Sequence, residues 1–166
     1  AEYKNYADHE KIERERLNAI TVDTVNPYEQ QSEVEHRIRS ERSRSGYSAF
    51  AKRGYRDAVN GYFSYRVTVL PNKPMAVQVT YSGNEGPSFV DGVRLERHFH
   101  ISIDGEIIAS EKLDRKRPHQ LFEVLYPIPS ELTKGKHQVE LKFASEINQI
   151  AGSVYGIRII DLSAMR

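Results

Sequence analysis

Three glutamates, Glu29, Glu33 and Glu35, lie within one short polar stretch near the start of the chain. A glycosidase needs two carboxyl groups about 5–10 Å apart across a sugar, one to donate a proton and one to act as base or nucleophile. The spacing in sequence does not give that separation, and glutamates in so polar a stretch are more often solvated. A free-standing sugar-active enzyme that uses this cluster is therefore kept as an alternative, and no catalytic residue is assigned.

Two histidines raise the question of a metal site. His98 and His100 alternate along an expected strand and so point to the same face, where Glu96 would complete a zinc-like ligand set. Leu95 and Phe99 occupy the opposite, core-facing positions, so we interpret the histidines as solvent-facing strand residues. The chain has no cysteine, which removes thiolate ligands and nucleophiles. We expect neither a metal nor a cofactor.

A basic stretch covers residues 37–56, with seven Lys or Arg side chains against one acid, Glu41. Tyr47, Phe50 and Tyr55 are interleaved with these charges, a composition also found in nucleic-acid-binding surfaces. The net charge of the whole chain is only +1, so we expect no nucleic-acid partner. The default interpretation is a solvated stretch, or arginines paired with the glutamates at positions 29–35. Contact with an acidic polysaccharide or a neighbouring domain is the functional interpretation, because Arg forms forked hydrogen bonds.

The element that must position these residues is a strand over residues 62–69. Its alternation places Phe63, Tyr65 and Val67 on a core face and leaves Tyr62 on the other face, free to meet a partner. A polar segment that contains an Arg-Asp pair leads into this strand.

Further alternating segments are bounded by turn residues, among them Asp104-Gly105, a strong hairpin signal. The other expected strands are residues 19–25, 76–81, 94–104, 106–110, 121–128, 137–144 and 154–162. No helical pattern lies between them, which disfavours a parallel βαβ sheet. The predicted fold is all-β: a β-sandwich of jelly-roll or galactose-binding-like type.

The N-terminal part does not follow this pattern. Residues 3–17 are charged and helix-prone, and we predict a short linker helix over residues 1–18 that leads from an upstream domain, followed by the sandwich domain over residues 19–166. Residues 26–61 show little periodicity and are predicted to form a long polar loop. No apolar run reaches the roughly 20 residues that a membrane span needs, so no membrane partner is expected.

Three stretches carry a resemblance to a known family. Residues 27–36 (PYEQQSEVEH) resemble a PGEQQxExDH signature, and residues 55–65 (YRDAVNGYFSY) resemble WRDA…GWFSY. Residues 126–129 (YPIP) and 152–158 (GSVYGIR) look like the closing part. Together these motifs resemble the C-terminal β-domain of secreted bacterial proteins similar to β-L-arabinofuranosidases of glycoside hydrolase family 127, over roughly residues 20–162.

The resemblance implies a non-catalytic accessory module in a secreted or periplasmic protein. In that family the catalytic cysteine and glutamate belong to an upstream (α/α)-barrel, and this chain has no cysteine. The implied partner is therefore that barrel domain of the same polypeptide, on which the module would pack. Binding of plant or host polysaccharide is a further expectation, with a purely structural interdomain role as its alternative; the sequence names no sugar.

The resemblance and the residue types together select seven candidate contact residues for carbohydrate or for the neighbouring domain. They are polar, planar or aromatic and flank the strand at residues 62–69: Glu29, Gln30, Glu33, His36, Arg56, Asp57 and Tyr62. We expect Arg56 and Asp57 to meet the segment at residues 29–36, either at a site or in a buried ion-pair network. Tyr28 stands where the family has Gly, which tolerates φ values that Tyr does not, so the turn is expected to change.

Overall fold

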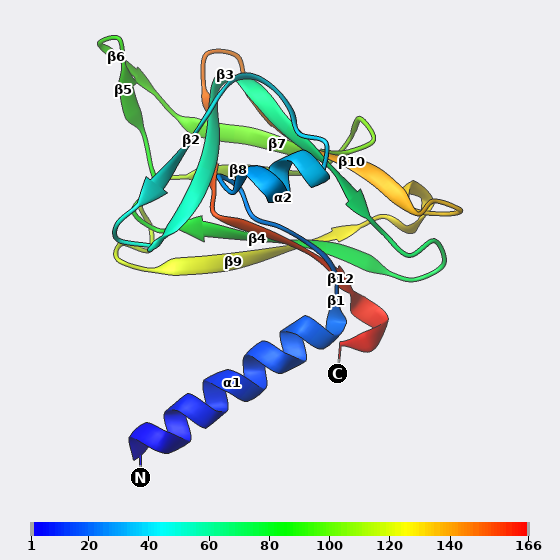
Figure 1. The fold of residues 1–166 in the computed structure, drawn as a ribbon. Helices are drawn as coiled ribbons and strands as arrows, with labels where there is room; N and C mark the ends of the chain where they lie inside the picture. The colour runs from blue at the N-terminus through cyan, green and yellow to red at the C-terminus, as the bar shows by residue number, and fades with distance from the viewer. Residues whose placement is uncertain (1, 166) are drawn as a thin grey trace.

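Two antiparallel sheets pack face to face in the computed structural model of the chain, which describes the backbone of residues 2–165 and the side chains of residues 7–165 (Figure 1). This arrangement confirms the predicted β-sandwich. The outermost residues of the predicted ranges, Ala1 and Arg166, lie outside the described residues.

The first sheet has four strands in the order β1-β12-β4-β9. Their bounds are Thr21–Val25 (β1), Gly156–Asp161 (β12), Met75–Ser82 (β4) and Leu121–Ile128 (β9). β4 is apolar because it lies between two strands and one of its faces lines the core, whereas its outer face carries polar side chains such as Gln78.

The second sheet has six strands, and its longest strand, β3, spans Arg53–Thr68. The others are Arg39–Ser48 (β2), Arg97–Ile103 (β7), Glu106–Leu113 (β8), Gln138–Ser145 (β10) and Ile150–Val154 (β11). The first half of β3 pairs with β11, its second half pairs with β10, and β2 runs along its other edge. A separate small hairpin consists of β5 (Ser88–Val90) and β6 (Val93–Leu95).

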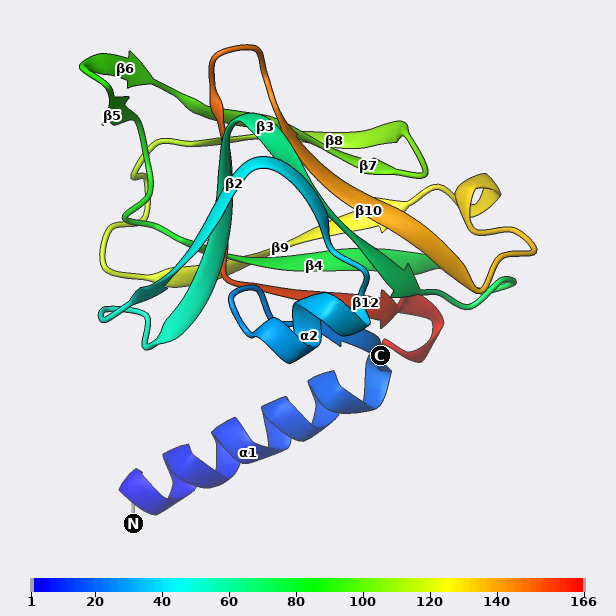
Figure 2. The same ribbon diagram turned by 45° about the horizontal axis from the view of Figure 1, so that its top comes forward.

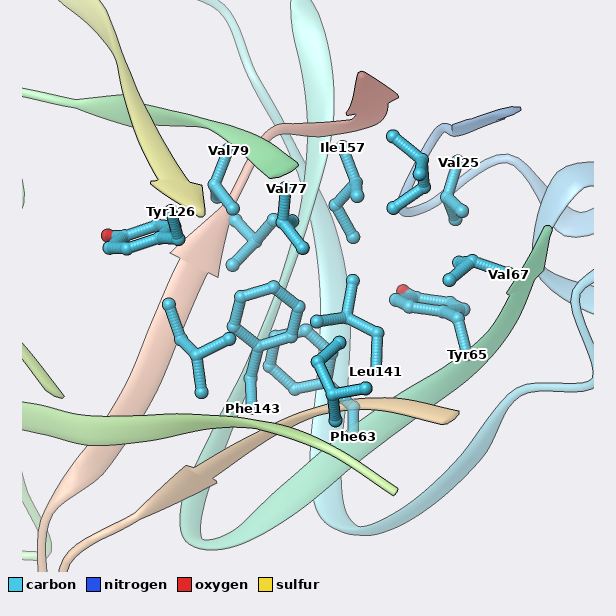
Figure 3. Packing of buried hydrophobic residues seen from close by; sticks show 14 of the residues in the cluster. Val25, Phe63, Tyr65, Val67, Val77, Val79, Tyr126, Leu141, Phe143 and Ile157 are labelled. Atoms are coloured by element: carbon cyan, nitrogen blue, oxygen red, sulfur yellow. The ribbon is translucent and has the colours of Figure 1, made fainter. Parts of the chain in front are cut away.

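The core lies between the two sheets (Figure 3). The predicted inward residues of β3, Phe63, Tyr65 and Val67, are fully buried, as the alternation indicated. Phe63 stacks on Phe143 of β10 with ring centroids 5.1 Å apart. The four-stranded sheet contributes aliphatic side chains such as Val79 from the opposite side, and close packing of this kind is the main favourable term in folding.

The expected long polar loop at residues 26–61 is the main correction to the predicted architecture. This segment contains the helix α2 (Gln30–Glu35), the strand β2 and the beginning of β3. β2 was missed because it pairs only with β3 and both of its faces are largely solvent-exposed, so it shows no apolar alternation.

The last predicted strand, residues 154–162, is also corrected. The chain forms β11 in one sheet, changes sheets at Tyr155 and continues as β12 in the other. The Tyr155 amide donates a 2.9 Å hydrogen bond to the Thr80 carbonyl oxygen of β4, which fixes the crossing point. Both strands are buried and apolar, so composition alone did not separate them.

The N-terminal helix α1 (Glu2–Ile20) projects from one end of the sandwich (Figure 2). Its described side chains are mostly exposed, and only Leu17 and Ile20 are partly buried. Two short 3-10 helices, Ser130–Leu132 and Leu162–Ala164, complete the described elements. Within residues 2–165, no helix has both the length and the apolar composition that crossing a membrane requires.

Candidate functional site

Glu33 of α2 anchors that helix to the sandwich. Its carboxylate accepts two hydrogen bonds from the Arg56 guanidinium of β3, 2.6 Å from Nε and 2.8 Å from Nη2. The Tyr65 hydroxyl donates a third hydrogen bond of 2.6 Å to the same carboxylate. Both charged side chains are largely buried, and such charges persist only when paired and hydrogen-bonded. The predicted meeting of Arg56 with the segment at residues 29–36 is confirmed.

The electrostatics of this network keep Tyr65 and Arg56 protonated. Burial, together with the neighbouring Glu33 carboxylate, raises the pKa of Tyr65 above its ordinary value, so its hydroxyl remains a donor. The hydrogen bonds to Glu33 raise the pKa of Arg56 further. Glu33 accepts all three hydrogen bonds and is buried, so its carboxyl group is not exposed to a substrate.

This arrangement does not support the carboxylate cluster as a catalytic pair. Glu29 and Glu35 are exposed, and Glu35 accepts a 3.0 Å hydrogen bond from the Gln31 side chain. Because Glu33 is buried under Arg56, no two members of the cluster face each other across an open cleft.

His36 ends α2 and connects it to β1. Its Nδ1 lies 2.7 Å from the Ser32 carbonyl oxygen, and its Nε2 lies 2.8 Å from the Asp23 carboxylate. Both ring nitrogens thus face acceptors, an environment that favours the doubly protonated imidazolium. Burial lowers the pKa of His36, but the Asp23 carboxylate and the Ser32 carbonyl outweigh it, so the net pKa is raised.

The His36 contact predicts a pH-dependent stability. A pKa raised in the folded state stabilises the fold fully below the unfolded value of about 6.5, and the stabilisation is lost as pH rises through the folded pKa. We expect the free energy of unfolding to fall as pH rises above about 6.5, and His36→Gln to remove most of that fall. Urea unfolding at a series of pH values measures this, with His137→Gln, at an exposed histidine, as the control. An unchanged pH profile in His36→Gln would contradict the assignment.

Asp57 does not meet the segment at residues 29–36, which corrects the prediction. Neighbouring strand residues point to opposite faces, so Asp57 turns away from Arg56 and towards Arg97 of β7. Its buried carboxylate lies 3.6 Å from Nη1 of Arg97 and accepts a 3.1 Å hydrogen bond from Arg44 of β2. The Asp57 carboxylate in turn raises the pKa of Arg44.

The remaining candidate residues do not join these networks. Glu29 and Gln30 are exposed where α2 begins. Tyr62 is half-buried on the outer face of β3, where the Lys142 ammonium lies 4.8 Å from its ring centroid. The structure therefore brings Glu33 together with Arg56, and leaves Asp57, His36 and Tyr62 at separate places.

Of the two histidines of β7, His100 is engaged with other groups, and the His98 ring centroid lies 6.1 Å from that of His100. His100 contacts the Glu146 carboxylate through Nε2 and the Ser110 hydroxyl through Nδ1, the latter at 2.7 Å. In the described part of the chain, no group of three or more His, Cys, Asp or Glu side chains is placed to hold a metal ion.

An exposed aromatic surface lies at the tip of the β2–β3 hairpin, outside the predicted contact residues. We call Tyr28, Tyr47 and Phe50 the hairpin-tip patch. Their exposed fractions are 45%, 56% and 48%, and the Tyr28 and Tyr47 ring centroids are 6.0 Å apart. Phe50 follows in the turn, which is closed by a 2.8 Å hydrogen bond from the Lys52 amide to the Ser48 carbonyl oxygen. Flat rings exposed beside polar groups suit stacking on a sugar.

Tyr28 reaches this patch through an unfavourable backbone conformation. Its φ is 81°, in a region that favours glycine and is uncommon for bulky residues. A conformation of this kind costs about 1–3 kcal/mol and tends to occur at functional sites. Gly54 permits the placement, because a Cβ at that position would collide with the Tyr28 side chain. Tyr28 thus adopts a φ that favours glycine, so the change expected in this turn from a Tyr at this position is not needed to accommodate the residue.

The sequence held a partial signal for the patch. Tyr47 and Phe50 stood out among the basic residues of positions 37–56, and Tyr28 stood out as a departure from the signature that residues 27–36 resemble. The proximity of Tyr28 and Tyr47 followed only from β2, because the Tyr47–Gly54 strand pairing brings Tyr47 beside the turn that contains Tyr28.

The fold is similar to that of solved family 35 carbohydrate-binding modules. The module from Paenibacillus barcinonensis superimposes with a TM-score of 0.56 and 11% identity, over 82% of this chain and 97% of that one. An exo-beta-1,3-galactanase from Phanerochaete chrysosporium gives a TM-score of 0.55 with 9% identity, over 82% of this chain but only 29% of that enzyme. The GH115 4-O-methyl-alpha-glucuronidase BtGH115A gives 0.52 with 11% identity, over 85% of this chain and 18% of that one.

The chain belongs to DUF6805, described as a family of unknown function, whose sequence profile matches residues 16–160. A search of curated proteins found no significant match. The matched region runs from the end of α1 to within β12, so it includes the hairpin-tip patch.

Proposed function

We propose that this chain is a non-catalytic accessory module of a glycoside hydrolase and that it binds carbohydrate through the hairpin-tip patch. The observation that carries the proposal is Tyr28, whose ring is exposed beside Tyr47 although its backbone conformation is unfavourable. Strain retained at an exposed aromatic residue indicates a role for its ring beyond stability.

The fold likeness supports the same proposal. The chain covers nearly the whole of an isolated carbohydrate-binding module but only a minor part of two glycoside hydrolases. This is the size relation expected of an accessory domain joined to a larger enzyme.

The parent protein that we propose is a secreted or periplasmic bacterial enzyme similar to β-L-arabinofuranosidases of glycoside hydrolase family 127. Its upstream (α/α)-barrel would be the partner domain, and the exposed helix α1 would lead to it. The ligands that we propose are plant or host polysaccharides. The motif resemblance at residues 27–36 and 55–65 supports this assignment.

Calorimetric titration with neutral plant cell-wall oligosaccharides tests the proposed function. We expect measurable binding by the wild-type chain and a Kd raised about tenfold or more by Tyr47→Ala, since losing one aromatic contact removes about 1.4 kcal/mol or more. Phe89→Ala is the matched control, because Phe89 is an exposed ring (75%) on the separate β5–β6 hairpin.

Two outcomes would contradict the proposal. If no oligosaccharide binds the folded chain, a purely structural interdomain role replaces carbohydrate binding. If Phe89→Ala weakens binding as much as Tyr47→Ala, the ligand does not bind specifically at the hairpin-tip patch. Thermal unfolding of each variant verifies that the fold is intact.

A further inference from the structure

A hollow of about 150 Å³ lies on the outer face of the four-stranded sheet, and none of the three rings of the hairpin-tip patch lines it. Its floor comes from Gln78 and Thr80 of β4 and from Gly156 of β12, and Arg53 and Arg158 line its sides. Its volume is below the roughly 300–1,000 Å³ typical of pockets that enclose a drug-sized ligand. The hollow therefore suits one small charged or polar unit.

The two arginines carry charges that no carboxylate neutralises at close range. Arg158 donates through Nη1 to two neutral acceptors, Asn18 Oδ1 at 2.9 Å and Thr21 Oγ1 at 3.1 Å. Among the side chains of residues 7–165, neither Arg53 nor Arg158 forms an ion pair. The lining contains one acid, Glu123, so two positive charges and one negative charge give a net charge of +1.

The proximity of Arg53 makes the positive charge of Arg158 less favourable. Burial and the like charge of Arg53 lower the pKa of Arg158 below its ordinary value, and the Glu123 carboxylate only partly offsets them. Two like charges held together in a partly buried hollow repel each other. An anion placed between them would relieve that repulsion.

Gly156 makes room for this arrangement. A Cβ at position 156 would lie 2.5 Å from Nη2 of Arg53 and 3.4 Å from the Thr80 hydroxyl. The guanidinium of Arg53 therefore lies directly over the backbone of β12, in space that any other residue would fill.

Gln78 supplies a complementary polar group. Its Oε1 is buried without a hydrogen-bond donor, the one such side-chain atom in the described part of the chain. A buried acceptor left unpaired costs about 1–3 kcal/mol. A ligand hydroxyl that donates to this oxygen would recover that energy.

We propose that the hollow between Arg53, Arg158 and Gln78 binds a negatively charged sugar unit, with its carboxylate or sulfate at the arginines and a hydroxyl at Gln78 Oε1. Guanidinium groups bind such anions through paired, charge-assisted hydrogen bonds. The anion site rests on its own geometry, whereas its assignment to a sugar rests on the proposed carbohydrate binding.

The test compares an oligogalacturonide with the same oligosaccharide after reduction of its carboxyl groups, both titrated into the full chain. We expect the charged form to bind at least about tenfold more tightly, by about 1.4 kcal/mol. Arg53→Gln and Arg158→Gln should each remove most of this preference. Arg66→Gln, at an exposed arginine of the six-stranded sheet, should leave it unchanged.

A second experiment uses a sulfated oligosaccharide and sodium sulfate, and it distinguishes a bound sulfate from a bound carboxylate. Tighter binding of the sulfated form than of the oligogalacturonide would assign the anion as sulfate. The Arg158→Gln variant should then lose this tighter binding as well. If no sugar binds, sodium sulfate should still raise the melting temperature of the wild type more than that of Arg158→Gln, and then only the carbohydrate assignment fails. Equal affinity for charged and reduced forms, or a preference retained in both arginine variants, overturns the anion site while the proposed function stands.

Discussion

Replacing Arg56 by methionine is expected to lower the free energy of unfolding by about 3–5 kcal/mol, because it leaves the buried Glu33 carboxylate without its charged partner. The Arg56 side chain is only 14% exposed, and two of its nitrogens donate to Glu33. Its Nη1 also donates to the Ser43 hydroxyl of β2 at 2.6 Å. Removing the Arg56 guanidinium therefore breaks the hydrogen bonds that join β3 to both α2 and β2. Urea unfolding of both proteins at one pH measures the difference.

An exposed ion pair provides the matched control for Arg56. Arg39 is 72% exposed and lies 3.7 Å from Glu140, so Arg39→Met should cost no more than about 1 kcal/mol. The double variant Arg56→Met with Glu33→Gln should recover part of the lost stability, because a neutral amide is less costly to bury than an unpaired carboxylate. Equal effects of Arg56→Met and Arg39→Met would show that the Glu33 network does not hold α2.

Replacing Arg97 by methionine is the second change with a large expected effect, again about 3–5 kcal/mol. Arg97 is buried and donates to the Gly86 carbonyl oxygen at 2.7 Å and to the Ser88 hydroxyl at 3.1 Å. It also lies 3.6 Å from the Asp57 carboxylate and 3.3 Å from that of Glu85. Without Arg97, the buried Asp57 would keep only Arg44 as a cationic partner, and Arg44 is mostly exposed.

The Arg97 prediction has both a global and a local readout. Denaturant unfolding gives the loss of stability, and amide hydrogen exchange should show faster opening of the segment from Glu85 to Ser88. Arg94→Met is the control, because Arg94 is exposed and pairs with Glu96 at the surface. Retained stability and unchanged exchange in Arg97→Met would contradict the structural role assigned to this network.

The two networks explain what the sequence could and could not predict. Period-2 alternation predicted the core face of β3 and of β10, because residues such as Phe63 and Phe143 alternate with polar neighbours. Arg97 lies at the alternating position between Leu95 and Phe99, which were predicted to face the core, but its partner Asp57 was assigned to the wrong neighbours. The side on which a polar residue lies depends on strand register, which was unknown while residues 26–61 were interpreted as a loop.

The candidate site shows the same limit. The residue types and the family motif selected Glu33 and Arg56, and these do meet, in a buried ion pair. The hairpin-tip patch was not predicted, because it requires the pairing of β2 with β3 and the unusual φ of Tyr28. A polar edge strand and a tyrosine with a positive φ give no periodic pattern in the sequence.

The most direct test of the proposed carbohydrate site is an NMR titration of the uniformly ¹⁵N-labelled chain with a neutral oligosaccharide that binds. The hairpin-tip patch predicts that the largest amide shifts occur around Tyr28, Tyr47 and Phe50 and disappear in Tyr47→Ala. Largest shifts around Tyr62, or shifts of equal size in the wild type and in Tyr47→Ala, would contradict the hairpin-tip patch as the carbohydrate-binding surface.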